Sequence, residues 1–351
     1  MLAQLTQQLG QRADLNDAQT QDAIAQLIAE NIAPEAKADF LTALARKGET
    51  AAEIAAFARA LRERAVPVPL DAATRAGEIL DVCGTGGDQL NTFNISTTVA
   101  LVCAAAGVIV AKHGNRAITS RSGSADVLEA LGIPVELSPE AAAHAMGEHG
   151  FAFLFAPRYH PAFRHIAPAR KLCAERGQKT IFNFLGPLLN PARPTAQLIG
   201  VPRPELCGPM AGVLQTLGIR RGMVVCGAVP ATPNQAAAAL DEFSTLGPTT
   251  LAEFYQDHAM AVSTFAPEHL PLQPAALSDL AGGNAQANAE ITRRILRGDE
   301  RGPKRDAVLL NAGAALFVAS RVKSIAAGWE LAAATIDDGR AAAKLAALAT
   351  T

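Results

Sequence analysis

The fold is decided by residues 81–97, which read DVCGTGGDQLNTFNIST. They join a predicted buried strand at Ile79–Val82 to a predicted helix at Ile95–Ala106 through a glycine-rich loop. Strands and helices then alternate, which predicts an α/β fold with a mostly parallel central sheet flanked by helices. The further strands are predicted at Val108–Ala111, Phe151–Phe155, Leu198–Val201 and Met223–Cys226, and the further helices at Ala125–Leu131, from Ser138-Pro139 onward, and at Leu206–Leu217, Ile291–Leu296, Ala307–Val318 and Trp329–Leu348.

The first 66 residues predict helices only. Thr50 and Glu53 form a capping box before an apolar-periodic stretch, and Pro34 suits the first turn of another helix. The segment AVPVP at 65–69 is a plausible link between domains because its prolines interrupt helix. We therefore expect a small all-helical domain at residues 1–72 and an α/β domain at 73–351.

Composition bounds the kind of protein. The chain has 351 residues, of which 49% are apolar and 18% charged, so it is long enough for two folded domains. A net charge of −2 gives no pull toward nucleic acid or an anionic membrane. Five cysteines without a CxxC spacing argue against a disulfide framework and a structural zinc site. No secretory signal or 18-residue apolar run occurs, so we expect a cytoplasmic protein.

The glycine loop itself suits a phosphate group. The glycines of GTGGD at 84–88 would let backbone amides approach an anion closely. Asn94, Ser96 and Thr97 then open a helix, whose N-terminus favours negative charge. The segment lacks the Gly-Lys-Ser/Thr of a P-loop and the spacing of a dinucleotide fingerprint. An ordinary strand–turn–helix corner is the alternative interpretation.

A second polar loop, KHGNRAITSRSGSAD, follows the next predicted strand at residues 112–126. It gathers cations and hydroxyl donors before a predicted helix, which again suits a polyanion, although a solvated basic turn would have the same composition. In a parallel sheet, loops at the carboxyl ends of strands converge on one site. The polar residues of this loop are Lys112, Arg116, Arg121, Ser120, Ser122 and Ser124.

The third segment is LDEFSTLGPT at 240–249, with adjacent carboxylates at Asp241 and Glu242. Alone, the pair would be an ordinary turn. Beside two phosphate-type loops it suggests magnesium, which takes carboxylate and phosphate oxygens as ligands. Cys83 and Cys103 lack a convincing paired histidine, so the constellation indicates catalysis by stabilising a leaving group rather than by a covalent intermediate.

Several long motifs, in order along nearly the whole chain, resemble the anthranilate phosphoribosyltransferase family. The resemblance implies a nucleoside phosphorylase/phosphoribosyltransferase-type fold, in which a returning segment near 168–191 completes the helical domain. It implies transfer of phosphoribosyl from 5-phosphoribosyl 1-diphosphate to anthranilate in tryptophan biosynthesis, with Mg²⁺, by a homodimer. The motifs are GTGGD at 84–88, TFNIST at 92–97, KHGNR at 112–116, SGSAD at 122–126, FAPRYHPAFR at 155–164, TIFNFLGPLLNP at 180–191 and LDEFSTLGPT at 240–249.

The resemblance also implies roles for individual residues. Asn115 and Arg170 would bind anthranilate, and Gly84 would lie where both substrates meet. His113 and His160 would line the acceptor channel, His113 in a positioning role, and no residue is assigned as catalytic. Ser96, Asp241 and Glu242 would hold magnesium. The full substrate-binding set is Gly84, Gly87, Asp88, Thr92, Asn94, Ile95, Ser96, Thr97, Lys112, His113, Gly114, Asn115, Arg116, Ser120, Ser124, His160 and Arg170.

Three features depart from the family pattern. Gln89 stands where the family usually has glycine, Lys179 stands where it prefers arginine, and KLCAERGQK at 171–179 is a few residues longer than usual. They bear on the local geometry near Arg170 and on the flexibility of the glycine loop.

Other functions remain open at this stage. A pyrimidine nucleoside phosphorylase shares the fold but has an STGGVGDK-type loop. A nucleic-acid-binding paralogue would show a basic surface and eroded substrate motifs, whereas this chain has a net charge of −2 and intact motifs. A catalytically idle homologue is also compatible with the sequence.

Overall fold

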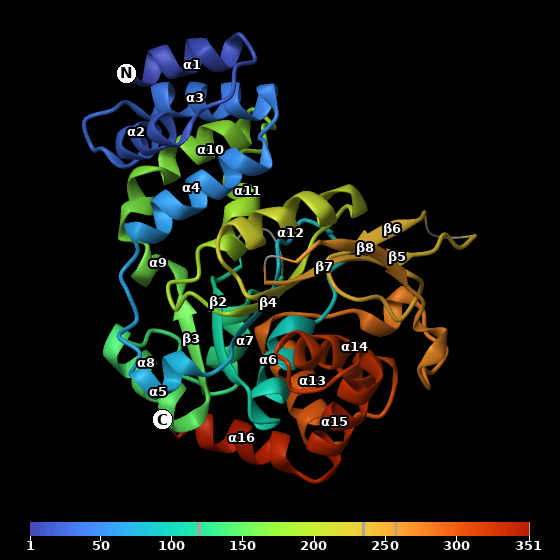
Figure 1. Ribbon diagram of the computed structural model, residues 1–351. Helices are drawn as coiled ribbons and strands as arrows, with labels where there is room; N and C mark the ends of the chain where they lie inside the picture. Colours follow the sequence, from blue (N-terminus) through green and yellow to red (C-terminus); the bar gives the residue numbers. More distant parts are fainter. Residues whose placement is uncertain (118–120, 234–235, 257, 351) are drawn as a thin grey trace.

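A computed structural model describes residues 1–117, 121–233, 236–256 and 258–350. A small helical bundle lies against one end of a larger lobe built on a single sheet (Figure 1). The described strands of the sheet run in the order β3-β2-β1-β4-β5-β7-β8, with β6 paired to β5. Their bounds are β1 Ile79–Gly84, β2 Ile109–Gly114, β3 Phe151–Phe155, β4 Ala196–Gly200, β5 Arg221–Val229, β6 Ala238–Leu240, β7 Thr249–Tyr255 and β8 Ala261–Phe265.

The predicted parallel sheet is confirmed. Strands β3, β2, β1, β4 and β5 are paired in parallel, so their carboxyl ends lie along one edge of the sheet. The antiparallel strands β6, β7 and β8 were not predicted. Strand β8 is the last strand on one side of the sheet, and most of its side chains are exposed. Its sequence AVSTF therefore lacks the apolar pattern of a buried strand.

Helices cover both faces of this sheet. One face packs on the C-terminal helices together with α6, and the other packs on α12, α8 and the end of the bundle. Short 3-10 segments occur at η1 Pro161–His165, η2 Gly186–Leu188, η3 Pro204–Leu206, η4 Pro267–His269 and η5 Leu277–Leu280. The helices of this lobe are α5 Ala72–Ala76, α6 Ile95–Ala105, α7 Ser124–Ala130, α8 Pro139–His149, α9 Ala156–Tyr159, α12 Cys207–Thr216, α13 Ala285–Leu296, α14 Pro303–Val318, α15 Ile325–Asp337 and α16 Arg340–Leu348.

One predicted helix is wrong in its length. The sequence predicted a single helix over Trp329–Leu348, but the chain turns at Gly339, whose φ of +83° lies in the left-handed region. Glycine adopts that region without steric cost, so the chain ends α15 there and starts α16 in a new direction.

The bundle contains two separate stretches of the chain. Its core combines side chains of the first four helices with Ile166, Ala169 and Cys173 and with residues of the α11 region. The Thr50–Glu53 capping box is present at the start of α4. The bundle helices are α1 Leu2–Gly10, α2 Asp17–Ile28, α3 Pro34–Lys47, α4 Ala51–Glu63, α10 Ala167–Glu175 and α11 Phe182–Leu185.

Buried polar contacts connect the two lobes. The Nζ of Lys37 on α3 donates to the carbonyls of Ala29, at 2.7 Å, and His165, at 2.9 Å, and thereby holds η1 against the bundle. The Nδ2 of Asn190 donates to Asp81 Oδ2 at 2.9 Å and to the Ala111 carbonyl at 2.7 Å. Asn190 therefore fixes the end of the returning segment to the middle of β1 and β2.

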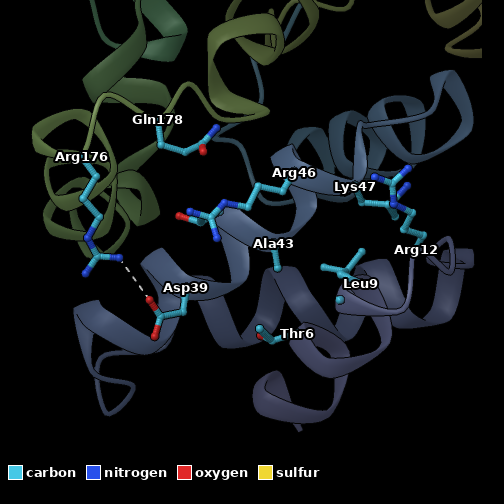
Figure 2. A pocket seen from close by; sticks show the side chains of 11 residues that line it. Thr6, Leu9, Arg12, Asp39, Ala43, Arg46, Lys47, Arg176 and Gln178 are labelled. Atoms are coloured by element: carbon cyan, nitrogen blue, oxygen red, sulfur yellow. Dashed lines mark hydrogen bonds and ion pairs between the residues drawn. The ribbon is translucent and has the colours of Figure 1, made fainter.

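The outer end of the bundle has a hollow of about 600 Å³ between α1, α3 and the end of α10 (Figure 2). Small side chains, Thr6 and Ala43, lie in it, and Arg176 pairs with Asp39 across it at 3.1 Å. In the described part of the chain, no helix has the length and apolarity that crossing a membrane requires.

Candidate active site

Two adjoining cavities open at the carboxyl edge of the parallel strands. The larger, which we call the donor cavity, has a volume of about 730 Å³ and lies among the three polar segments singled out in the sequence. The smaller, which we call the acceptor cavity, has a volume of about 280 Å³ and lies between the sheet lobe and the returning segment. Both cavities are lined by Cys83, Gly84, His113, Gly114 and Asn115.

The carboxylates Asp241 and Glu242 reach the donor cavity because glycines lie at or near the carboxyl ends of three neighbouring strands. A Cβ at Gly200 would lie 1.5 Å from the Asp241 carbonyl oxygen, and one at Gly84 would lie 2.3 Å from Asp241 Oδ2. At Gly227 it would lie 2.6 Å from the Glu242 carbonyl oxygen. The acidic segment can therefore cross the ends of β1, β4 and β5 only where side chains are missing.

The position of the acidic pair is further fixed by hydrogen bonds. Gly86 N–H donates to Asp241 Oδ2 at 2.7 Å, and Ser96 N–H donates to Glu242 Oε1 at 3.1 Å. Asn311 on α14, fully buried, both donates to and accepts from the backbone of Phe243, at 3.1 and 2.9 Å. The pair thus joins the glycine loop, the start of α6 and a C-terminal helix.

Two buried carboxylates side by side suit a cation. Burial, with the negative charge of Asp88, raises the pKa of Asp241 to about 7. Burial, with the charge of Asp241, raises the pKa of Glu242 to about 8, although Lys112 acts in the opposite direction. A bound divalent cation would remove this like-charge crowding, so Asp241 and Glu242 fit a magnesium ion. The hydroxyl of Ser96, which lines the same cavity, would supply a further oxygen ligand.

Lys112 is the cation at the floor of the donor cavity. It is 1% exposed, and its Nζ donates to the Val82 carbonyl at 2.7 Å and lies 3.5 Å from Ser96 Oγ. Burial lowers its pKa from the usual lysine value. A phosphoryl group in the cavity would give this ammonium a strong partner in a place where water does not screen it.

Aromatic rings and one arginine form the wall of the acceptor cavity. The rings of His113 and His160 meet edge to face, with centroids 5.2 Å apart, and His160 stacks on Phe163 at 5.2 Å. Phe163 meets Phe182 edge to face, and the Arg170 guanidinium lies over the Phe182 ring at 5.3 Å. A planar aromatic molecule carrying a carboxylate would find both stacking partners and a cation here.

The two histidines of this wall are neutral. Burial lowers the pKa of His113 to about 3 and that of His160 to about 4. Among the described atoms, the Nε2 of each ring is buried and has no hydrogen-bond partner. A histidine with so low a pKa is a weak base at neutral pH, so the wall offers hydrogen-bond acceptors and not a strong proton acceptor.

Most of the substrate-binding residues expected from the sequence line these cavities. Arg116 does not: its guanidinium pairs with Glu129, at 2.7 Å, and lies over the ring of Phe155. Ser120 lies outside the described residues. Around the donor cavity lie Gly84, Gly87, Asp88, Thr92, Asn94, Ile95, Ser96, Thr97, Lys112, His113, Gly114, Asn115, Ser124, Asp241 and Glu242, and around the acceptor cavity lie Gly84, His113, Gly114, Asn115, His160 and Arg170.

The departures from the family pattern have structural counterparts. Gln89 has a φ of +59°, a conformation that glycine adopts more easily, which explains the glycine that the family uses there. Lys179 is exposed and lines neither cavity. Arg176 and Gln178, in the longer segment, border the outer hollow of the bundle (Figure 2). The extra length therefore lies away from Arg170.

Sequence reasoning missed Gly200, Gly227, Asn190 and Asn311. Each acts by packing or hydrogen bonding to a residue distant in the chain. No local motif marks Gly200, Gly227 or Asn311, whereas Asn190 lies in the TIFNFLGPLLNP motif, which gave it no role.

The fold and the paired cavities define a transferase for an anionic donor, and comparison with known proteins gives the family. The family model described as "Glycosyl transferase family, a/b domain" matches residues 76–342, and "Glycosyl transferase family, helical bundle domain" matches residues 3–65. The chain belongs to this glycosyl transferase family, among its anthranilate phosphoribosyltransferases.

Individual relatives agree. The chain is 46% identical to the anthranilate phosphoribosyltransferase of Symbiobacterium thermophilum, over 96% of this chain and 94% of that protein. The crystal structure of the Thermus thermophilus enzyme matches with a TM-score of 0.86 and 41% identity, over 99% of this chain and 98% of that one. The Saccharomyces cerevisiae enzyme in complex with PRPP and Mg matches with a TM-score of 0.84 and 27% identity, over 98% and 96%.

Gly200→Ala should displace the acidic segment and weaken cation binding. The added Cβ overlaps the Asp241 backbone, so we expect a loss of about 1–3 kcal/mol in the free energy of unfolding and a smaller rise in melting temperature when MgCl₂ and pyrophosphate are added. The control is Gly212→Ala on α12, where the new Cβ meets no atom within 4 Å. Equal cation-induced shifts in both variants would show that Gly200 does not position the pair.

Proposed function

We propose that this protein transfers the phosphoribosyl group of 5-phosphoribosyl 1-diphosphate (PRPP) to the amine of anthranilate and releases pyrophosphate, as a step of tryptophan biosynthesis. The observation that carries the proposal is the shared wall at Gly84. A cavity built for a polyanion meets there a cavity with aromatic rings and an arginine. The names of the relatives agree with this reaction.

The donor side would bind PRPP through backbone amides, hydroxyls and Lys112. Gly86 and Gly87 have positive φ values and line the donor cavity, where their missing side chains leave the backbone accessible. The N-terminus of α6 adds the partial positive charge of a helix end. We assign the donor-cavity residues named above to this substrate.

Magnesium would be held by Asp241, Glu242 and the Ser96 hydroxyl, with phosphate oxygens completing its ligands. When bound, the ion neutralises charge that builds up on the departing pyrophosphate. The Saccharomyces cerevisiae relative has been solved with both PRPP and Mg, which supports this assignment.

The acceptor side would hold anthranilate by its carboxylate and its ring. Arg170 would pair with the carboxylate, while the His113–His160–Phe163 wall would fix the ring plane. The aromatic amine is already neutral at pH 7, so alignment toward the donor, and not removal of a proton, is what the wall supplies. The hard step is then loss of the diphosphate from the ribose carbon, which the charged groups of the donor cavity assist.

The direct test is turnover. Purified protein with PRPP and magnesium should consume anthranilate, followed as loss of anthranilate fluorescence. The same preparation should not cleave pyrimidine nucleosides in phosphate. Nucleoside cleavage without anthranilate consumption would instead favour the phosphorylase alternative.

We further propose the chain's organisation. The division falls near residue 72, and the segment near 168–191 completes the helical domain, as the mixed core of the bundle supports. A homodimer through the helical domain, as the family resemblance implies, is our proposal for assembly; the hollow of Figure 2 offers a second chain a concave surface lined by both small and charged side chains. Light scattering on the purified protein tests this. Five free cysteines suit a cytoplasmic location.

Arg170→Ala should weaken the use of anthranilate and leave PRPP binding nearly unchanged. Loss of a charged partner for the carboxylate predicts a rise in the KM for anthranilate of about ten- to a hundredfold. Arg176→Ala, on the bundle side of the same region, is the control. If calorimetry showed equal losses for both ligands, Arg170 would be structural.

The double change Asp241→Asn, Glu242→Gln should nearly abolish turnover, whereas His113→Ala should cost roughly tens- to a few hundredfold. The two variants are compared in one steady-state assay. With a pKa near 3, His113 should contribute no ionisation to the kcat/KM profile between pH 6 and 8. If the His113 variant were less active than the metal-pair variant, and if the wild-type rate followed one ionisation near neutral pH that the His113 variant lacked, His113 would be a general base.

The same double variant should keep the fold and change its pH dependence. Burial raises the pKa of both carboxyls in the folded state, so the wild type binds extra protons when folded and loses stability as pH rises toward 8. Without magnesium, the uncharged variant should therefore gain more stability over the wild type at pH 8 than at pH 5. A difference independent of pH would contradict the assigned electrostatics.

A further inference from the structure

Asn288 on α13 contacts a side chain of the donor cavity from outside that cavity. It is 2% exposed, and its Nδ2 donates to Asn94 Oδ1 at 2.7 Å. Its own Oδ1 accepts from Gly283 N–H at 2.7 Å. Asn94 in turn directs its Nδ2 toward the Ser122 carbonyl, at 3.4 Å, in the second polar loop.

These contacts fix the direction of both amides. A backbone N–H can donate only to an oxygen, so Gly283 holds the oxygen of Asn288 toward itself and turns the Nδ2 toward Asn94. Asn94 must then present its oxygen to Asn288 and its N–H donors to the cavity side. The orientation of Asn94 is thus set by a helix that supplies no described wall of the donor cavity.

This orientation also leaves α6 without a side-chain N-cap bond, although the Ser96 N–H of its first turn donates to Glu242 Oε1. Asn94 occupies the N-cap position, where an asparagine oxygen ordinarily accepts from the first-turn amides, yet it makes no such capping bond to the described residues of α6. Its oxygen is instead engaged by Asn288. Nearby, Thr97 lines the donor cavity, is 1% exposed, and its Oγ1 is buried without a partner among the described residues. A helix start without its side-chain cap and an unpaired buried hydroxyl beside it together indicate a ligand with acceptor oxygens.

We propose that Asn288 is a positioning residue for the donor substrate. By holding the oxygen of Asn94, it keeps that side chain from capping α6 and turns its N–H donors toward a phosphoryl group bound at the helix start. The identity of this ligand as PRPP rests on the proposed function, whereas the arrangement of the two asparagines does not.

The test compares two buried changes on α13. Asn288→Leu keeps a similar volume but cannot donate to Asn94. Thr292→Val removes the hydrogen bond of 2.9 Å between Thr292 and Thr98, which also joins α13 to α6 but touches no described group of the cavity. Calorimetric titration with PRPP and MgCl₂ should show about tenfold weaker binding for Asn288→Leu and unchanged binding for Thr292→Val. The KM for anthranilate should stay the same in both.

A double-mutant cycle separates positioning from general damage. If Asn288 acts through Asn94, the loss caused by Asn288→Leu should disappear in an Asn94→Ala background. Full additivity, or equal losses in Asn288→Leu and Thr292→Val, would overturn the proposal. Asn288→Ser, a smaller change, replaces Asn288→Leu if thermal unfolding shows that the leucine variant is not folded.

The outcomes also distinguish this inference from the proposed function. A wild-type protein that binds PRPP but leaves anthranilate unconsumed would refute the proposed reaction, while the asparagine cycle would still decide the role of Asn288. Normal turnover with PRPP affinity unchanged in Asn288→Leu would refute the role of Asn288 alone. A wild-type protein with no affinity for PRPP would overturn both.

Discussion

The site depends on one steric constraint: the segment that carries Asp241 and Glu242 must cross the ends of three strands at near-contact distance. Glycine at positions 84, 200 and 227 makes this crossing possible, since any side chain there would occupy the space of the acidic segment. The crossing brings two carboxylates beside the glycine loop and the start of α6. Without this crossing, the glycine loop and the second polar loop would offer cations and amides, but Asp241 and Glu242 would not lie opposite them.

Burial then gives these groups their chemical character. Burial raises the pKa of Asp241 and Glu242 and lowers the pKa of Lys112, because it disfavours the charged form of each group. A bound partner of opposite charge would stabilise that charged form. The acceptor wall behaves differently, because burial there keeps His113 and His160 neutral. One cavity thus contains buried charged groups and the other neutral rings beside one arginine, and the two share the backbone at Gly84 and Gly114.

The sequence predicted those parts of the molecule that local pattern determines. Strand β1, its glycine loop and α6 form one continuous stretch with a clear apolar rhythm, and the structure confirms them. Strand β8 was missed because an exposed edge strand needs no alternation of apolar residues. Strand β7, which is largely buried between β5 and β8, was missed as well. Arg116 was placed at the substrate from a motif, but Glu129, Glu136 and Asp126, which lie on a later turn of the chain, take its guanidinium. Asn288 and Asn311 act across distances that no motif covers.

The composition of the bundle core has a consequence for the growing chain. Leu5, Phe40 and Phe57 share their core with Ile166 and Leu185, which are synthesised much later. A ribosome therefore releases the first four helices, which pack on one another, before α10 and α11 can cover the rest of their apolar surface, and strands β1 to β3 emerge in between. The N-terminal helices keep part of their apolar surface exposed until α10 and α11 are synthesised. We therefore expect chaperones to bind the nascent N-terminal region during translation.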